Sequence, residues 1–446
     1  MKRRLKIALA YLLLLALSGC AIQPGDKTVV LPTPRATENA NEQTEENDWT
    51  VRRIRQCEVV TGCVDEENQS VALGWSNGKL YVVEGAAGQA VSVRCVDPRY
   101  GFFETCAVLG KIDYERLKLS PDGSALLYTV RKETGETELY LYRVKQKKAE
   151  KVADIPFLSP YLGVDFCWTA DGSRFFYWVT SSFSDKPYQM EMEMYGGEVP
   201  PTQEYWARIR GNPYLNQIMR GDAKTGNVKT VLAMHSEMPI SKNRMEVFGE
   251  DLATAFLKEV SPSEDGSCVL ARYLSQEELS WKYVYADCET GEYKMRQIER
   301  LENLIPAGKS YSIEQVTQDG FLLNTYENND VSIELYQERG TLKKIGSMNS
   351  SKYYWYTDMQ MAPDGSHVLA VEHRMDGESV VAVYSTEDGG RKLLYQTARP
   401  IVSVRVTPDG KQVLICTVSG TQVTENQDGY VEDDNKVAFI VTILEI

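Results

Sequence analysis

One short pattern in the sequence could supply a nucleophile. Residues Gly74-Trp75-Ser76-Asn77-Gly78 match G-x-S-x-G, the elbow that presents a serine on a sharp turn between a strand and a helix. Here the pattern falls at a corner between two segments with β-strand alternation, in register with later corners of the same kind. We therefore interpret Ser76 as a hairpin residue and not as a catalytic serine.

Other residue types that commonly carry chemistry are sparse. The three histidines, His235, His367 and His373, do not form a H-E-x-x-H or comparable metal pattern,. No glycine-rich phosphate loop leads from a strand into a helix, and the spacing around Asp433 and Asp434 is not that of a calcium-binding EF-hand loop. We expect no metal and no cofactor.

A corner ending in Asp-Gly recurs between short apolar segments. It occurs in "LKLSPDGSALLYTV" (117–130), and its aspartate returns at 122, 171, 265, 319, 364 and 409. Proline presets φ at about −65°, aspartate bonds nearby amides and glycine accepts positive φ, which together specify a type I turn followed by a left-handed residue. Each corner is therefore predicted to join two antiparallel strands.

The spacing of these corners predicts the fold. A period of 45 to 50 residues built from short β-strands is the signature of a β-propeller,. We predict an all-β protein with seven four-stranded blades, and six or eight remain open because the first unit is irregular. The blades are expected near 51–98, 113–154, 163–233, 252–299, 311–346, 355–397 and from 400 to the C-terminus.

The last predicted blade lacks its fourth strand. A segment near residues 50–60 could supply it, which would close the ring and leave no sheet edge exposed. No helix of any length is expected. The predicted organisation is a signal peptide (1–19), a lipidated cysteine with a flexible linker (20–49) and the propeller domain (50–446).

These Asp-Gly corners resemble those of the WD40-like, TolB-type propeller family. The same repeat occurs in propeller domains of prolyl-oligopeptidase-type peptidases. The resemblance covers about residues 50–446 and implies the fold, but a short corner motif says little about function. The chain departs from TolB-type proteins, which carry an α/β domain before the propeller, and it has no room for a peptidase's hydrolase domain.

The N-terminus "MKRRLKIALAYLLLLALSGC" has the layout of a secretory signal: positive charges, an apolar run and small residues,. Residues Leu17-Ser18-Gly19-Cys20 resemble the lipobox of bacterial lipoproteins, which implies cleavage before Cys20 and acylation of its sulfur, with palmitate as a typical chain. The alternative is an ordinary signal peptide with an incidental cysteine. Two or three acyl chains, at roughly 0.8 kcal/mol per buried CH₂, make a stable anchor.

We therefore expect an extracytoplasmic protein anchored by lipid to the bacterial cell membrane, or to the outer membrane if the source has one. Residues 21–49 are rich in Pro, Thr, Asn and Glu and are predicted to be a flexible tether that spans roughly 30 Å on average. Removal of residues 1–19 takes away four positive charges and changes the formal charge from −14 to −18. This charge argues against nucleic acid as a partner.

Nine cysteines become eight if Cys20 is lipidated, an even number in an exported protein,. Cys167 and Cys416 lie within apolar strands and are interpreted as buried thiols. The remaining six are candidates for disulfides. The pairs suggested by position in the sequence are Cys57 with Cys63, Cys95 with Cys106, and Cys268 with Cys288, the last brought together across a hairpin.

Long connections are predicted to gather at one end of the propeller, where second strands lead to third strands and each blade leads to the next. They are assigned to 97–112, 182–215, 234–251, 300–310, 347–355 and 419–436. Aromatic side chains there would give contact area with few rotatable bonds. The candidate ligand-binding residues are Tyr100, Phe103, Tyr188, Tyr195, Trp206 and Trp355, although packing of these side chains onto the blades is the alternative for each one.

The favoured function is a non-enzymatic binding or scaffolding module, a monomer, for a protein, peptide or glycan. The alternative is an envelope hydrolase or lyase acting on glycans with carboxylates such as Glu191, Glu198 or Glu204, and a third possibility is a structural partner in an envelope assembly. An enzyme should show titratable residues converging at the axial mouth. A binding module should show an apolar or aromatic patch there, and an assembly factor should show one on the rim.

Overall fold

The structure is a computed structural model. It describes residues 49–61, 72–76, 79–84, 90–97, 102–110, 112–156, 162–181, 214, 216–233, 256–275, 280–317, 319–328, 330–337, 339–348, 353–374, 377–407, 410–425 and 431–446, with some side chains in these ranges not placed.

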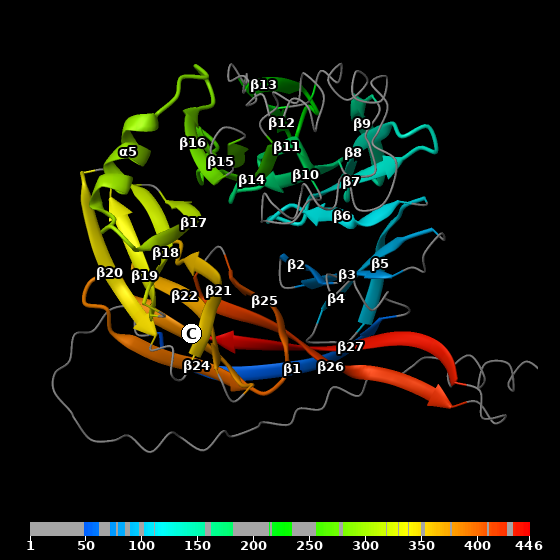
Figure 1. Ribbon diagram of the computed structural model, residues 1–446. Coiled ribbons are helices and arrows are strands. Elements are labelled where there is room, and N and C mark those ends of the chain that lie inside the picture. Colours follow the sequence, from blue (N-terminus) through cyan, green and yellow to red (C-terminus); the bar gives the residue numbers. More distant parts are fainter. Residues whose placement is uncertain are drawn as a thin grey trace, which may run out of the picture.

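Seven β-sheets surround a central axis in these residues (Figure 1). Within each sheet neighbouring strands are antiparallel. They also follow one another along the chain, except that the outermost strand of the last sheet comes from the N-terminal part of the chain. The first strands of neighbouring blades contact each other around most of the ring, which makes the first strand of each blade the innermost. The seven-bladed propeller predicted from the corner spacing is confirmed.

The first four blades contain the following strands. Blade 1 has β2 (Ala72–Ser76), β3 (Lys79–Glu84), β4 (Ser92–Asp97) and β5 (Phe102–Val108); blade 2 has β6 (Asp113–Leu119), β7 (Ala125–Arg131), β8 (Thr137–Arg143) and β9 (Lys148–Ile155); blade 3 has β10 (Leu162–Trp168), β11 (Arg174–Ser181), β12 (Gln217–Asp222) and β13 (Val228–Ala233); blade 4 has β14 (Phe256–Pro262), β15 (Cys268–Ser275) and β16 (Ser280–Asp287).

The remaining blades complete the ring. Blade 5 has β17 (Ser310–Thr317), β18 (Gly320–Glu327), β19 (Asp330–Gln337) and β20 (Thr341–Met348); blade 6 has β21 (Tyr353–Met361), β22 (His367–Arg374), β23 (Ser379–Ser385) and β24 (Arg391–Thr397); blade 7 has β25 (Ile401–Val406), β26 (Gln412–Glu425), β27 (Val431–Glu445) and, from the other end of the chain, β1 (Arg53–Thr61).

The ring closes as predicted. Strand β1 pairs antiparallel with β27 over its whole length, from Arg53 opposite Glu445 to Thr61 opposite Val437. The N-terminal strand thereby occupies the outer position that the C-terminal segment leaves open, so two ends of the chain hold one blade together.

Blade 4 departs from the prediction. Among the described residues it has three strands, and its fourth position holds only a single bridge between Ala286 and Tyr293. The helix α5 (Met295–Leu304) follows, with Ile298 and Leu301 buried. These residues are three apart and lie on one helical face, so the expectation of no helix is wrong. No helix in the described part of the chain is long and apolar enough to cross a membrane.

The repeated corner has the predicted turn chemistry. In blade 2, Asp122 Oδ1 accepts hydrogen bonds from Ser120 Oγ at 2.6 Å and from the backbone N–H of Ser124 at 3.0 Å. Gly123 follows with a φ of 68°. The glycines of four other corners, Gly172, Gly266, Gly365 and Gly410, have φ between 65° and 71°. The aspartate is therefore occupied in shaping its own turn.

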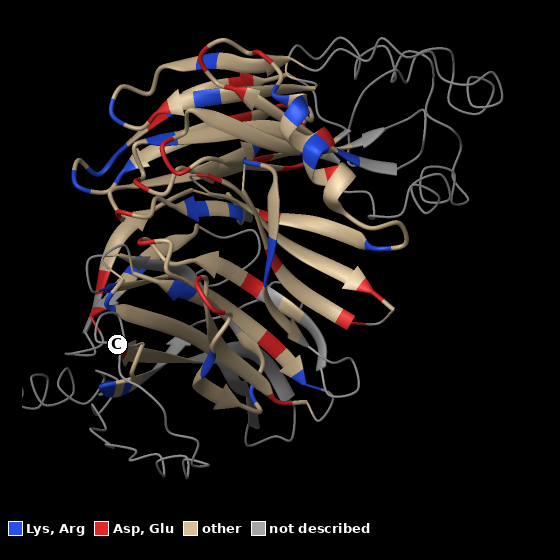
Figure 2. Ribbon diagram, turned by 90° about the vertical axis from the view of Figure 1, so that its left-hand side faces the viewer, with Lys and Arg blue, Asp and Glu red and all other residues tan. Residues whose placement is uncertain are grey.

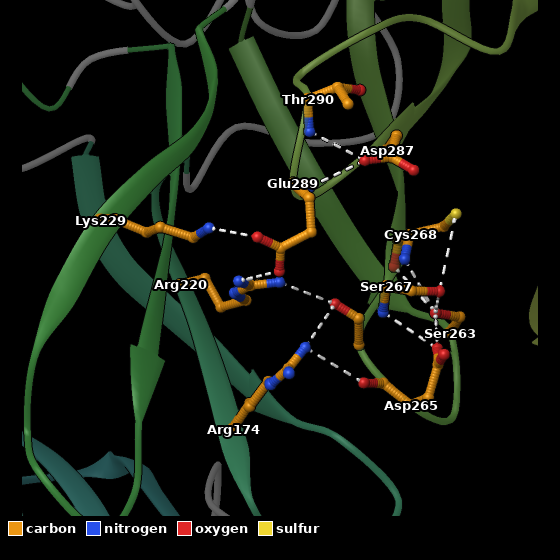
Figure 3. Close-up of polar contacts among 11 residues, drawn as sticks. Arg174, Arg220, Lys229, Ser263, Asp265, Ser267, Cys268, Asp287, Glu289 and Thr290 are labelled. Carbon is orange, nitrogen blue, oxygen red and sulfur yellow. Dashed lines mark hydrogen bonds and ion pairs between the residues drawn. The ribbon is translucent and has the colours of Figure 1, made fainter.

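The corners also join neighbouring blades. Figure 3 shows Arg174 and Arg220 of blade 3 reaching the corner of blade 4, where Arg220 donates to the Gly266 carbonyl at 3.2 Å and Arg174 to the Asp265 carbonyl at 3.3 Å. Glu289 accepts from Arg220 at 2.5 Å and from Lys229 at 2.8 Å. These contacts lie at the end where first strands lead to second strands, which we call the corner end.

The opposite end, which we call the connection end, is where second strands lead to third strands and each blade leads to the next. Because the strands alternate in direction, β11 ends and β12 begins at this end, and β13 ends and β14 begins there as well. Residues 419–425 and 431–436, predicted as a loop, instead belong to β26 and β27, which form a long hairpin beyond the rest of the blade (Figure 1).

Candidate binding site at the propeller axis

The inner strands are connected around the axis by polar groups. Lys118 of β6 forms an ion pair with Asp165 of β10 at 3.0 Å, and Arg116 donates to the Val164 carbonyl at 2.6 Å. Cys167 of β10 donates to the Val260 carbonyl of β14 at 3.4 Å. These bonds fix the inner strands of blades 2, 3 and 4 relative to one another.

The same arrangement continues on the other side of the axis. Gln315 of β17 accepts from the backbone N–H of Met361 in β21 at 2.8 Å. Gln360 of β21 accepts from the backbone N–H of Val406 in β25 at 3.2 Å. These bonds connect the inner strands of blades 2 to 4 and of blades 5 to 7. We call the inner strands around the axis the axial wall, and charged groups on it are positioned by these contacts.

Two glutamates of adjacent inner strands form the main feature of this wall. Glu259 lies in β14, and Glu314 lies in β17. The Glu259 side chain remains open to solvent, but the packed strands around it remove part of its water. This burial raises the pKa of Glu259, and the nearby carboxylates of Glu314 and Asp165 raise it further. Arg272 and Lys258 act in the opposite direction without cancelling the effect.

A third carboxylate lies on the next inner strand. Asp358 of β21 has a φ of 48°, which is uncommon for a residue other than glycine,. Burial raises its pKa, and the Arg405 guanidinium of blade 7 acts against this rise. Carboxylates whose charged form is disfavoured are candidates for a functional site.

Two of these carboxylates, Glu314 and Asp358, lie where the pairing between strands is irregular. The register between β17 and β18 shifts between Ile313 and Gln315, so Glu314 is an additional residue without a direct partner. A similar shift in β21 between Thr357 and Gln360 contains Asp358. Such bulges redirect side chains and are frequent beside functional sites.

The carboxylate oxygens of this wall can replace water molecules around a positively charged group and so bind it. Because the pKa of Glu259 is raised, this side chain can also hold a proton. Among the described residues, no group of three or more His, Cys, Asp or Glu side chains is arranged to hold a metal ion. Acidic and basic residues are interspersed over the described blades in the side view (Figure 2).

Other residues considered for chemistry have structural surroundings. Ser76 is buried, and a Cβ built on Gly123 would lie 2.7 Å from its side chain, so Ser76 supports the neighbouring corner. His367 contacts Ser366 at 2.8 Å, and His373 contacts Ser379 at 3.1 Å. Asp433 and Asp434 lie within β27.

Several predicted site residues lie outside the described part of the chain. This holds for Cys20, Cys63, Tyr100, Tyr188, Tyr195, Trp206 and the carboxylates Glu191, Glu198 and Glu204. For Cys57 the structure gives only a backbone position in β1, opposite Val441.

Two predicted aromatic residues are in strands and not in long connections. Phe103 belongs to β5, opposite Val96. Trp355 belongs to the inner strand β21, opposite His373. Aromatic runs such as Tyr353–Tyr356 have high β-propensity, which explains why they extend a strand.

The structure does not join Cys268 and Cys288 by a disulfide. Both are free thiols, and Cys268 lies opposite Asp287, one residue away from Cys288. A shift of one residue turns a side chain to the other face of a sheet. Cys268 accordingly packs in the core between blades 4 and 5, and Cys288 in the core between blades 3 and 4.

Cys95 and Cys106 are also free thiols, but both belong to the same core cluster. The interpretation of Cys416 as a buried thiol is confirmed, whereas Cys167 is only partly buried.

The axial carboxylates were not among the predicted site residues, although the sequence contains a signal for them. Charged residues stand four to six positions before the aspartate of six corners: Lys118, Asp165, Glu259, Glu314, Asp358 and Arg405. Because each corner follows an inner strand, this offset places all six within these strands, from the middle of β10 and β14 to the penultimate residue of β6 and β25.

No protein-family model and no curated protein matches this chain. Among solved structures, it is similar to an oligogalacturonate lyase in complex with manganese, with 15% identity, a TM-score of 0.51, and coverage of 82% of this chain and 86% of that one. TolB from Acinetobacter baumannii has 15% identity, a TM-score of 0.38 and coverage of 81% and 79%. At such identities the similarity shows the propeller fold alone.

Proposed function

We propose that this protein is a lipid-anchored extracytoplasmic binding module whose axial wall takes a cationic side chain of a peptide or protein partner. The observation that carries this proposal is the placement of Glu259 and Glu314 on the adjacent inner strands β14 and β17, where burial and then the charge of Glu314 raise the pKa of Glu259. A lysine or arginine between them would relieve the repulsion between the two carboxylates and donate charge-assisted hydrogen bonds to both.

The scaffold supports binding because the site needs no rearrangement. Inter-blade bonds from Lys118, Gln315 and Gln360 hold the inner strands around the site. A site fixed before binding loses little conformational entropy when a partner is bound. The lipobox resemblance at Cys20 and the predicted tether support the location outside the cytoplasm.

The test uses short peptides of defined charge. The probes are an oligopeptide with two lysines, the same peptide with arginines, and a matched peptide with glutamates, each titrated calorimetrically. We expect binding of the two basic peptides, no binding of the acidic one, and at least about tenfold weaker binding when Glu259→Gln and Glu314→Gln are combined, because a desolvated charge pair is worth on the order of 1.4 kcal/mol or more.

The matched control is Glu133→Gln combined with Glu387→Gln, which removes the same charge from exposed turns away from the inner strands. If the control weakens binding as much as the axial pair does, the attraction is due to net charge and the axial proposal is wrong. Binding of a neutral glycan in preference to all three peptides would also contradict it.

A second candidate function rests on the same two glutamates. A carboxyl with a raised pKa beside another carboxylate is the arrangement used for general acid and base catalysis on glycans. An acidic axial wall would repel an anionic sugar such as oligogalacturonate, the substrate in the name of a similar structure, so neutral or cationic glycans are the relevant class. Release of reducing ends or unsaturated products, lost in Glu259→Gln, would favour this enzyme reading.

A further inference from the structure

The thiols of Cys95 and Cys106 lie together in the core of the first blade. Cys95 in β4 is 2% exposed, and Cys106 in β5 is 8% exposed. Both donate to the same residue: Cys95 Sγ to Glu104 Oε2 at 3.9 Å and Cys106 Sγ to the Glu104 carbonyl at 3.7 Å. Burial raises the pKa of the Cys106 thiol, and a hydrogen-bonding contact with the Cys95 thiol raises it further.

The strand pairing explains why the two thiols share a face. Cys95 lies opposite Glu104, and residues two apart on a strand point to the same side,. The register then shifts, because Arg94 is opposite Thr105 while Val93 is opposite Ala107. Cys106 is therefore the additional residue of a bulge, and a bulge bends its strand locally.

We propose that Cys95 and Cys106 form a disulfide when the chain folds in an oxidising compartment, and that Cys268 and Cys288 stay as thiols. The oxidant is an external disulfide, either a small-molecule disulfide or a disulfide oxidoreductase. One cysteine thiolate attacks the external disulfide and releases one reduced thiol. The second cysteine then displaces the other thiol, so two protein thiols lose their hydrogens while one external disulfide becomes two thiols.

Burial determines when this exchange can occur. Burial and the neighbouring Cys95 thiol raise the pKa of Cys106 to about 12, which suppresses the reactive thiolate. Once blade 1 is packed, an external disulfide has little access to either sulfur. The bond therefore forms during folding, before the core closes, and the folded reduced protein resists oxidation.

The bond would join the two outer strands of blade 1. This blade packs against blade 2, where the Tyr142 hydroxyl donates to the Cys106 carbonyl at 3.4 Å. A cross-link between β4 and β5 limits the separation of these strands in the unfolded chain, which stabilises the folded state. The disulfide would lie in blade 1, whereas the glutamates of the proposed peptide site lie in blades 4 and 5. Formation of the disulfide and binding of a peptide can therefore be tested independently.

The experiment uses the full chain carrying Cys20→Ala, refolded from denaturant with a mixture of oxidised and reduced glutathione. Free thiols are then alkylated under denaturing conditions, and the protein is digested and mapped by mass spectrometry. We expect a cross-linked peptide containing Cys95 and Cys106, alkylated Cys268 and Cys288, and a urea midpoint that falls when the bond is reduced.

Cys106→Ser should remove this cross-link and its gain in urea midpoint, whereas Cys268→Ser should leave both unchanged. Native protein that was folded under reducing conditions should gain the bond at least about tenfold more slowly, because its thiolates are suppressed. Alkylation of Cys95 and Cys106 after oxidative refolding, or a cross-link from either one to Cys57 or Cys63, would overturn the proposal. Circular dichroism of reduced wild-type protein separates loss of the bond from loss of the fold.

Discussion

At the scale of the residue, Glu259 holds its proton to a higher pH in the folded chain than in water, because its pKa is raised. Burial among the inner strands and the charges of Glu314 and Asp165 disfavour its ionised state, and Arg272 offsets this only in part. A glutamine would fill the same space without carrying a charge. Retention of an unfavourable charge at an open position is expected where the charge serves binding or proton transfer.

Glu259→Gln should therefore change how stability depends on pH. The folded pKa of Glu259 lies above the unfolded value, so the folded state binds more protons in the window above the unfolded pKa of about 4.3,. The contribution of this group to stability is present below that window and is lost as pH rises through it. We expect the urea midpoint of the wild type to fall more than that of the variant between pH 4 and pH 7, as a series of urea titrations would measure.

Glu133→Gln is the control for this series, since it removes an exposed carboxyl from the turn after β7. Its pH profile should follow that of the wild type. Identical slopes for wild type and Glu259→Gln would mean that Glu259 titrates normally in the folded protein.

At the scale of the element, the corners combine a local turn with contact between blades. Gly123 and Gly365 have nearly the same φ, 68° and 71°. A Cβ on Gly123 would meet Ser76 at 2.7 Å and the Tyr81 hydroxyl at 3.2 Å, whereas a Cβ on Gly365 would meet nothing within 4 Å. An alanine at position 365 would therefore introduce backbone strain alone, whereas an alanine at position 123 would introduce the same strain and also a clash with the neighbouring blade.

We expect Gly365→Ala to lower the free energy of unfolding by roughly 1–2 kcal/mol, the cost of a left-handed residue that carries a Cβ. Gly123→Ala should lower it further, because Ser76 and the blade behind it must also shift. Urea denaturation of both variants measures the difference. Equal losses would show that the corner of blade 2 gains nothing from its contact with blade 1.

The same corners explain how much of the fold the sequence predicted. Their spacing depends on local turn chemistry, which is visible in the residues, so it identified seven blades and the closing strand β1. It did not find β5, because aromatic residues at 102–103 resemble a loop as well as a strand, nor α5, whose apolar face is short. Tertiary packing decides such segments.

The candidate site was less predictable than the fold. The predicted site consisted of aromatic residues in long connections, whereas the described inner strands carry Glu259, Glu314 and Asp358. A single charged residue in a predicted strand is common and does not by itself indicate a site. Only closure of the ring brings carboxylates from different blades together, and only the pairing register assigns Cys268 and Cys288 to different faces.

At the scale of the whole molecule, the topology fixes where the predicted tether begins. Strand β27 ends at the corner end, where the Ile446 N–H bonds the Lys411 carbonyl at 3.0 Å, and β1 starts beside it. Trp49 is buried there and packs against His367 with a centroid distance of 5.4 Å. Lys392 donates to Thr50 at 2.8 Å. The chain is therefore held at the corner end before it enters the propeller.

If Cys20 carries the proposed lipid, the corner end should lie nearer the membrane on average, with the connection end directed away from it. Glu387→Cys places a fluorophore at the corner end, after β23, and Glu133→Cys places one at the connection end, after β7; both positions are exposed. On vesicles containing an acceptor dye, energy transfer should be greater from position 387, because the tether attaches at that end. Cys20→Ala should abolish transfer from both positions by releasing the protein. Equal transfer from the two labels on anchored protein would mean that the tether of about 30 Å lets the propeller rotate freely, and greater transfer from position 133 would refute the proposed orientation.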